Sequence, residues 1–221
     1  MTEPRMNLQL NLAIHLDSGL MIASGVSGRA VHKAVTRDGM GRLVVPASSL
    51  KGRLRYHLGR LEALLPRTAP RAVSVEETLL GSRASDNGVG VPGCLYFDDA
   101  HTARDASGTH PREPVEVRAG IQLSRRTGSV AKGHLHFFEA ASPGLVFYTA
   151  IEGDLPGGRQ GDALGLLLGA LDRVDKLGGG KSRGLGSVRL RVTSLKLNGR
   201  LEDAARLRTD YVRMCIKEAG A

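Results

Sequence analysis

Aromatic residues are scarce in this sequence, which contains no tryptophan, four tyrosines and four phenylalanines. Several RNA-binding modules stack bases on aromatic side chains of an open sheet face, and they carry these side chains in RNP-type motifs. No such motif occurs in this sequence. Base stacking on a sheet is therefore not expected, and any contact with a nucleic acid would depend on charge.

Cysteine is scarce as well. The two cysteines, Cys94 and Cys215, lie far apart and belong to no CxxC or Cys/His pattern. This spacing excludes a disulfide framework and a structural zinc site, so no metal or cofactor is predicted. No apolar run approaches membrane-spanning length, and the first residues lack the basic and then apolar order of a signal peptide. The sequence predicts a cytoplasmic protein with no membrane contact.

Acidic residues are outnumbered by basic ones. The chain of 221 residues has 31 lysines and arginines against 22 aspartates and glutamates, a formal net charge of +9. This charge favours a polyanionic partner such as nucleic acid, but an ordinary basic enzyme can have a similar balance. The length and a hydrophobic content of 41% predict one domain, residues 1–221, with a substantial core. The placement of the charges has to decide between the two interpretations.

Hydrophobic periodicity predicts an alternation of strands and helices. Residues 6–16 alternate between apolar and polar side chains, as in a half-buried strand, and leucines recur at helical spacing over 50–61. The predicted order is a strand at 6–16, a loop at 17–45, a helix from about 48, an insertion at about 66–140 that contains a short strand at 93–101, a strand at 145–151, a helix at 162–174, a strand at 186–197 and a C-terminal helix at about 201–217. This order matches an α+β fold of the ferredoxin-like or RRM-like βαββαβ plan, in which two helices cover one face of an antiparallel sheet.

The start of the first predicted helix carries a cluster of polar groups. Ser48 or Ser49 is the predicted N-cap, and Lys51 and Arg55, four residues apart, share one face. Free backbone N–H groups, the serine hydroxyls and the helix dipole would together bind a phosphate or a carboxylate. The alternative is a capped helix with a solvated basic face.

A glycine-rich segment, GGGKSRGLG, lies between the helix predicted at 162–174 and the strand predicted at 186–197. Consecutive glycines allow a backbone to wrap an anion, and Lys181 and Arg183 add positive charge. A nucleotide-binding Walker motif is excluded, because Asp175 stands where its first glycine is required and because the loop leads from a helix to a strand. Anion binding is favoured over a simple flexible connection.

Two alternating segments around the turn-rich SRRTGSVAKG predict a hairpin over residues 116–138. The cations on or beside it are Arg118, Arg125, Arg126 and Lys132. They would track an RNA backbone, although a charged hairpin tip often serves solubility alone. His134 and His136 project from one face of a strand, but they lack the carboxylate or cysteine partners of a metal site. Asp98 and Asp99 point to opposite faces of a strand and are interpreted as turn or cap residues.

Four segments of the sequence are together typical of one protein family. VVPASSLKGRLR is similar to its strand-to-helix motif, and LLGS followed by GCLYFDDA is similar to its next landmark. EVRAGIQLSRRTGSVAKGHLHFFE resembles its hairpin segment, and GGGKSRGLGSVRL resembles its glycine-rich loop with the strand after it. In this order the segments resemble the RAMP superfamily of CRISPR proteins, and most of all the repeated backbone subunit of type III effector complexes.

The resemblance implies a palm of ferredoxin-like fold and a hairpin thumb that wedges between the bases of a guide RNA at regular intervals. The implied partners are the guide (CRISPR) RNA, a complementary target RNA that pairs alongside, and other RAMP subunits, including copies of the same chain. Because base pairing would supply the specificity, the protein would grip phosphates without reading sequence. The RNA-binding residues assigned in this way, and expected to converge on one surface track, are His32, Lys33, Arg37, Ser48, Ser49, Lys51, Arg53, Arg55, Arg125, Arg126, Lys132, Gly179, Gly180, Lys181, Ser182 and Arg183.

The segment before the first helix departs from the family's pattern. Cleaving backbone subunits carry an aspartate there, within Asp-x-Pro-Val-x-Arg-Asp, whereas this chain reads HKAVTRD from His32 to Asp38. Histidine could act as a general base towards a 2′-hydroxyl group or contact a phosphate, and Asp38 is interpreted as structural. No catalytic residue is assigned, and a guide-RNA scaffold is favoured. The alternatives are an endoribonuclease that uses His32 to cut target or precursor guide RNA, and a basic structural protein unrelated to CRISPR, such as a ribosome-associated domain.

Overall fold

The computed structural model describes residues 5–23, 32–64, 74–82, 90–103, 114–126, 128–157 and 160–219. In chain order the elements are β1 (Met6–Leu16), β2 (Val44–Val45), α1 (Ala47–Glu62), α2 (Val75–Leu80), β3 (Leu95–Phe97), β4 (Ala100–Thr102), β5 (Val115–Leu123), β6 (Val130–Ala141), β7 (Val146–Leu155), α3 (Gln160–Asp172), the 3-10 turn η1 (Lys181–Arg183), β8 (Val188–Leu197), β9 (Arg200–Leu201) and α4 (Ala204–Ala219). Among these helices none combines the length and the hydropathy that a membrane span requires.

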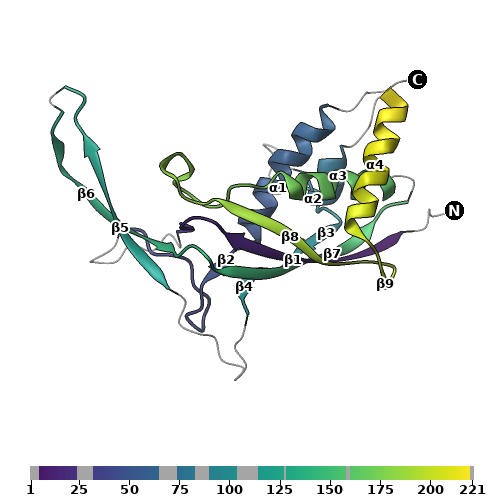
Figure 1. The fold of residues 1–221 in the computed structure, drawn as a ribbon, viewed down its shortest axis with the longest axis horizontal. Coiled ribbons are helices and arrows are strands. Elements are labelled where there is room, and N and C mark those ends of the chain that lie inside the picture. The colour runs from purple at the N-terminus through teal and green to yellow at the C-terminus, as the bar shows by residue number, and fades with distance from the viewer. Residues whose placement is uncertain are drawn as a thin grey trace.

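The main sheet has seven strands in the order β2-β4-β7-β1-β8-β9, with β3 also paired to β7. β1 is central and runs antiparallel to β7 and to β8. α1 follows β1 in the chain, α3 joins β7 to β8, and both helices lie on the same side of the sheet (Figure 1). The predicted α+β fold, a ferredoxin-like palm with a hairpin and a C-terminal helix, is therefore confirmed.

Leucine side chains of β1, α1 and α3 fill the core between the sheet and the helices. Leu8 and Leu10 of β1 are fully buried, as the alternation predicts, and Leu54 and Leu58 of α1 are at most 1% exposed at helical spacing. Residues 163–168 of α3 are all buried, because this helix packs against both α1 and α4. Each buried leucine contributes roughly 1.5–3 kcal/mol to folding, so this core fixes the positions of the surrounding loops.

The start of the C-terminal helix and the content of the range 66–140 are among the predictions that differ from the structure. The C-terminal helix begins at Ala204, since Asp203 accepts hydrogen bonds from the N–H groups of the first helical turn, at 2.8 Å in the case of Ala205. Leu201, the predicted first residue of that helix, lies in β9 and is 72% exposed. The range 66–140, assigned to an insertion, also contains β3 and β4, which pair with β7 in the main sheet.

The hairpin β5–β6 forms a separate two-stranded sheet that extends away from the palm (Figure 1). β5 ends at Leu123 and β6 begins at Val130, so the hairpin predicted over 116–138 is confirmed with slightly longer strands. The chain just after β1 ties the hairpin to the palm. There Leu20 forms a bridge with Ala141 at the end of β6, and the next residue bridges to the glycine-rich segment.

Candidate nucleic-acid interface

The glycine-rich segment forms a tightly built turn. Gly180 and Gly184 adopt left-handed backbone conformations, with φ of 70° and 79°, on either side of η1. A Cβ atom at Gly186 would lie 2.0 Å from the carbonyl oxygen of Leu177, so only glycine fits there. Leu185 is 1% exposed and anchors the turn. The exposed polar side chains of the turn are Lys181, Ser182 and Arg183.

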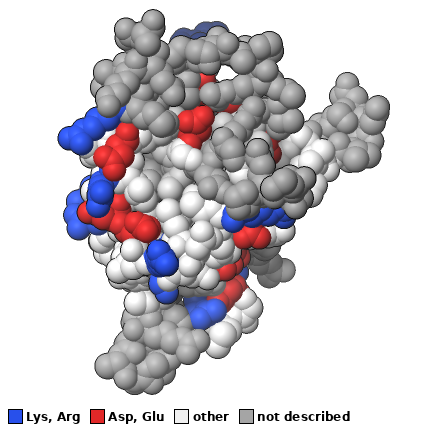
Figure 2. All heavy atoms as spheres, turned by 90° about the vertical axis from the view of Figure 1, so that its right-hand side faces the viewer, with Lys and Arg blue, Asp and Glu red and all other residues white. Residues whose placement is uncertain are grey.

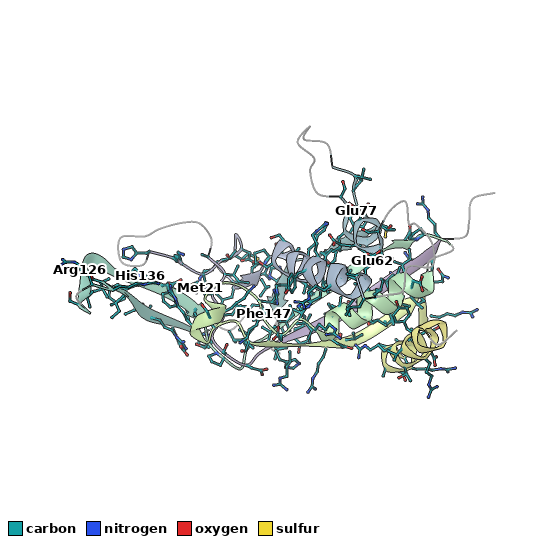
Figure 3. All side chains as sticks on the ribbon, turned by 90° about the horizontal axis from the view of Figure 1, so that it is seen from above. Met21, Glu62, Glu77, Arg126, His136 and Phe147 are labelled. Atoms are coloured by element: carbon teal, nitrogen blue, oxygen red, sulfur yellow. The ribbon has the colours of Figure 1, made fainter. Side chains whose placement is uncertain are left out.

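The turn lies between the hairpin and α1 (Figure 1). The N–H group of Gly179 donates to the carbonyl of Met21, and that of Gly186 to the carbonyl of Gly19, both at 2.8 Å. Figure 3 shows Met21 near the inner end of the hairpin, with His136 and then Arg126 further out. Backbone hydrogen bonds to residues 19–21 therefore hold the turn beside the base of the hairpin.

Helix α1 brings a cation next to this turn. Nη2 of Arg53 lies 3.7 Å from Oδ1 of Asp175, which precedes the glycine-rich segment. The pKa of Lys181 is lowered, first by desolvation and then by the positive charge of Arg53. A bound anion would offset the positive charge that lowers the pKa of Lys181. Asp175 offsets only part of the charge, because its side chain is 72% exposed.

The other two cations predicted on α1 lie on a different flank of the helix. Nζ of Lys51 is 5.7 Å from the centre of the Phe97 ring on β3. Arg55 forms a 2.8 Å ion pair with Glu76 and donates to two carbonyl groups at the C-terminal end of α2. Helix positions two residues apart do not share a face. Arg53 is thus the α1 cation on the side of the turn, and a single track that also includes Lys51 and Arg55 stays a prediction.

The predicted N-cap of α1 is wrong. The helix begins at Ala47, so Ser48 and Ser49 lie inside its first turn, and the N-cap residue is Pro46. Oδ1 of Asp99 accepts a hydrogen bond from the N–H group of Ala47 at 2.7 Å. This carboxylate supplies the negative charge that the helix dipole favours at the start of α1. The interpretation of Asp99 as a cap residue is confirmed.

Residues 32–38 run beside the base of the hairpin. The N–H group of His32 donates to the carbonyl of Phe137 at 2.9 Å, and Nδ1 of the His32 ring accepts from the N–H group of Phe137 at 3.2 Å. The ring centres of His32 and His136 are 6.4 Å apart. Asp38 accepts hydrogen bonds from the side chain and backbone of Arg42, which lower its pKa to about 2. The structural interpretation of Asp38 is confirmed.

The remaining predicted RNA-binding residues lie mostly in solvent. The exposed side chains are those of Lys33, Arg37, Arg125 and Arg126. One of them is engaged locally, because Nη1 of Arg37 donates to the carbonyl of Gly41 at 2.8 Å. The side chain of Lys132 lies outside the described residues. In the part of the chain that the structure describes, no group of three or more His, Cys, Asp and Glu side chains could hold a metal ion.

The hairpin also has an exposed apolar face, which the charge-based reasoning missed. Val117, Ile121 and Leu135 are 59%, 54% and 50% exposed, and the strand register places Ile121 opposite Leu135. The signal was present in the alternation of Val117, Ala119 and Ile121 along β5. Contiguous apolar side chains on an extended ribbon are typical of a contact surface.

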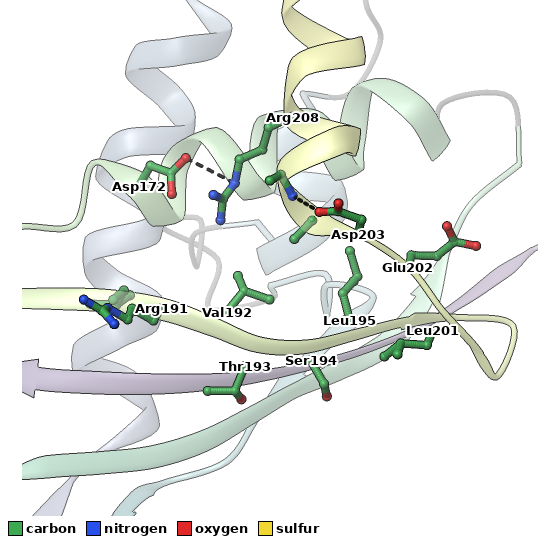
Figure 4. Close-up of a pocket in the computed structure, with 13 residues that line it drawn as sticks. Asp172, Arg191, Val192, Thr193, Ser194, Leu195, Leu201, Glu202, Asp203 and Arg208 are labelled. Atoms are coloured by element: carbon green, nitrogen blue, oxygen red, sulfur yellow. Dashed lines mark hydrogen bonds and ion pairs between the residues drawn. The ribbon is translucent and has the colours of Figure 1, made fainter.

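A cleft between α4 and β8 carries charges of both signs (Figure 4). Nε of Arg208 lies 3.2 Å from Oδ2 of Asp172 on α3. On the outer side of α4, Arg206 and Arg213 both pair with Asp210, at 3.7 and 3.9 Å. Figure 2 shows basic and acidic side chains side by side at this end of the molecule. The lining of the cleft holds three acidic side chains, Asp172, Glu202 and Asp203, against two arginines, so the cleft is not a candidate for a polyanion.

Comparisons with known proteins agree with this architecture. A family model described as the RAMP superfamily matches residues 13–189. No curated protein matches the sequence. Among solved structures, a chain of "Type III-B Cmr-beta Cryo-EM structure of the Apo state" is similar in fold with a TM-score of 0.61 and 15% sequence identity, over 84% of this chain and 97% of that chain.

Proposed function

The chain belongs to the RAMP superfamily, and we propose that it is a guide-RNA-binding subunit of a type III-like CRISPR effector complex. The family match spans the palm, the hairpin and the glycine-rich turn. In this role the subunit grips the guide backbone and leaves the bases free to pair with a target RNA. Neighbouring subunits are other RAMP proteins or copies of this chain.

The cationic turn carries the proposal. Lys181, Ser182 and Arg183 stand on a backbone that glycines hold in left-handed conformations, and Arg53 lies beside them. Hydroxyl and cationic groups of this kind bind phosphates of any nucleotide sequence. A subunit that presents a guide needs this indifference, because the guide itself reads the target. Lys51, on the other flank of α1, has a smaller share in binding.

The hairpin supports the same function in a second way. Arg125 and Arg126 at its tip provide charge for a backbone, and the apolar face of Val117, Ile121 and Leu135 provides a surface for unstacked bases. An extended ribbon with this composition fits the role of a thumb that inserts between segments of the guide. RNA recognition commonly uses such splayed bases.

Charge neutralisation at the turn tests this function. In the variant Lys181→Gln/Arg183→Gln, affinity for a repeat-derived guide RNA should fall, and the slope of log K against log salt should decrease by about 1.4, roughly 0.7 for each lost phosphate contact on a single strand. Arg206→Gln is the control, because that cation is exposed but paired with Asp210 on α4. Unchanged affinity and slope in the double variant would refute the proposed function.

A second candidate function, an endoribonuclease, rests on the two imidazoles at the base of the hairpin. His32 and His136 have ring centres 6.4 Å apart and come from different segments. One imidazole could take the proton of a 2′-hydroxyl as its oxygen attacks the adjacent phosphorus. The other would give a proton to the departing 5′-oxygen, leaving a 2′,3′-cyclic phosphate and a 5′-hydroxyl.

Labelled RNAs separate this candidate from the scaffold. Wild type, His32→Ala and His136→Ala proteins are incubated with a target RNA and with a precursor guide RNA, and product ends are identified. Cleavage that each substitution lowers at least about 100-fold, the usual range for general acid–base catalysis, supports the nuclease. No cleavage, or cleavage that both variants retain, removes it and leaves the scaffold.

A further inference from the structure

The outward face of α1 carries a preassembled group of cations around one aromatic ring. The guanidinium carbons of Arg53 and Arg60 lie 5.1 and 5.6 Å from the centre of the Tyr56 ring. Nη1 of Arg60 also donates a 2.7 Å hydrogen bond to the Tyr56 hydroxyl. Tyr56 is 47% exposed, so the group is open to solvent. The ring holds the two like charges in position by cation–π attraction.

The surroundings of His57, the next residue on α1, show the same excess of positive charge. Nη2 of Arg53 lies 3.3 Å from Nε2 of the His57 ring, and since a guanidinium only donates, that nitrogen is unprotonated. The pKa of His57 is lowered, first by burial and then by Arg53, with further contributions from Arg173 and Arg60, against the opposing effect of Asp175. The surroundings therefore resist one more positive charge and favour an anion.

The geometry points to this outer α1 cluster, made up of Arg53, Tyr56 and Arg60, as a second phosphodiester-binding site that continues the RNA path of the glycine-rich turn. Both guanidinium groups lie beside one ring, so the cluster offers two neighbouring cations to the RNA backbone. Asp175 faces Arg53 across 3.7 Å and occupies the place of a phosphate until RNA displaces it. This assignment rests on the proposed function.

Three variants test the cluster with the same repeat-derived guide RNA. Arg60→Gln should bind about three- to tenfold more weakly and lower the salt slope by about 0.7. Tyr56→Ala should weaken binding similarly, whereas Tyr56→Phe keeps the ring and most of the affinity. Asp175→Asn should bind up to about fivefold more tightly, because an exposed ion pair no longer competes. Arg206→Gln on α4 serves as the matched control.

The outcomes separate this inference from the function on which it rests. If Lys181→Gln/Arg183→Gln weakens binding while Arg60→Gln and Tyr56→Ala do not, the cluster is overturned and the proposed function stands. If none of these variants changes binding, both fail. Displacement of RNA by millimolar inorganic phosphate at constant ionic strength would assign the cluster to a free anion and also overturn the inference. Thermal melts of each variant verify that the chain is folded.

Discussion

Two arginines of this molecule look alike in isolation and differ in their surroundings. Arg53 on α1 and Arg208 on α4 are 22% and 30% exposed, each lies near one aspartate, and each has an Nε without a hydrogen bond among the described residues. For Arg208 the carboxylate lies 3.2 Å from that Nε. For Arg53 the carboxylate is 3.7 Å from Nη2, and the other neighbours include Lys181 and Arg60.

The difference shows why net charge is a poor guide to a binding surface. At the α4 end, Arg208 faces Asp172 on α3, and Arg206 and Arg213 share Asp210 of their own helix. Around the glycine-rich turn the cations come from α1, from the end of α3 and from the turn itself, and they gather around a single exposed carboxylate. The location of uncompensated charge, rather than its total, indicates where a polyanion binds.

The largest effect is expected from the backbone of the turn. Gly186→Ala places a Cβ atom 2.0 Å from the carbonyl oxygen of Leu177, whereas Gly184, also left-handed, has nothing within 4 Å. Gly184→Ala should cost about 1–2 kcal/mol in the free energy of unfolding, from strain alone. Gly186→Ala should cost at least about 3 kcal/mol and abolish guide-RNA binding. Urea unfolding of both variants measures the gap, and equal losses would contradict the close fit.

Arg55 should behave as a structural cation. Its ion pair with Glu76 is largely shielded, with side chains 18% and 16% exposed, and it ties α1 to the end of α2. Arg55→Gln should lower the free energy of unfolding by about 2 kcal/mol, because the Glu76 carboxylate loses its charged partner. Guide-RNA affinity of the folded variant should stay within about twofold. A large loss of affinity without a loss of stability would place Arg55 on the RNA path.

Neutralising Arg53 and Arg208 one at a time tests the comparison between them. Arg53→Gln should weaken guide-RNA binding about tenfold, equivalent to about 1.4 kcal/mol, while Arg208→Gln should leave it unchanged. Fluorescence anisotropy at two salt concentrations measures both. If the two variants lose affinity equally, binding follows total charge, and the cation-rich surroundings of Arg53 have no functional meaning.

The fold was largely readable from periodicity. The alternation in β1 and the leucine spacing of α1 are set by local geometry and burial, and both elements appear where they were expected. The predicted start of the last helix is wrong because the apolar spacing extends back to Leu201. The helix in fact begins after Asp203, whose side chain caps its first turn. Hydrophobic periodicity therefore predicts the buried face of an element well, but it predicts the first and last residues of that element poorly.

The sequence predicts which residues form the glycine-rich turn, but it does not predict which side chains from other elements lie beside it. The glycines and cations of the turn were identified from their local pattern, and that pattern is local in the structure too. The side chains beside the turn could not be identified in this way, because only the tertiary packing of α1 against α3 brings Arg53 to Asp175 and leaves Lys51 at Phe97. The hydrogen bond from the N–H group of Ala47 to Asp99, 52 positions away in the sequence, also depends on tertiary packing.

The smallest effect is expected at Lys51, and it bears most directly on the path of the RNA. The Lys51 ammonium lies over the Phe97 ring on the flank of α1 that faces β3 and α2. Lys51→Gln should change guide-RNA affinity by less than about twofold, the level of a rim charge, whereas Lys181→Gln alone should change it about fivefold. The two variants remove the same charge from the same chain, so their ratio is independent of net charge. Equal losses would mean that the RNA crosses the start of α1 and contacts both flanks, and the path through Arg53 and Arg60 would then be one branch of a wider surface.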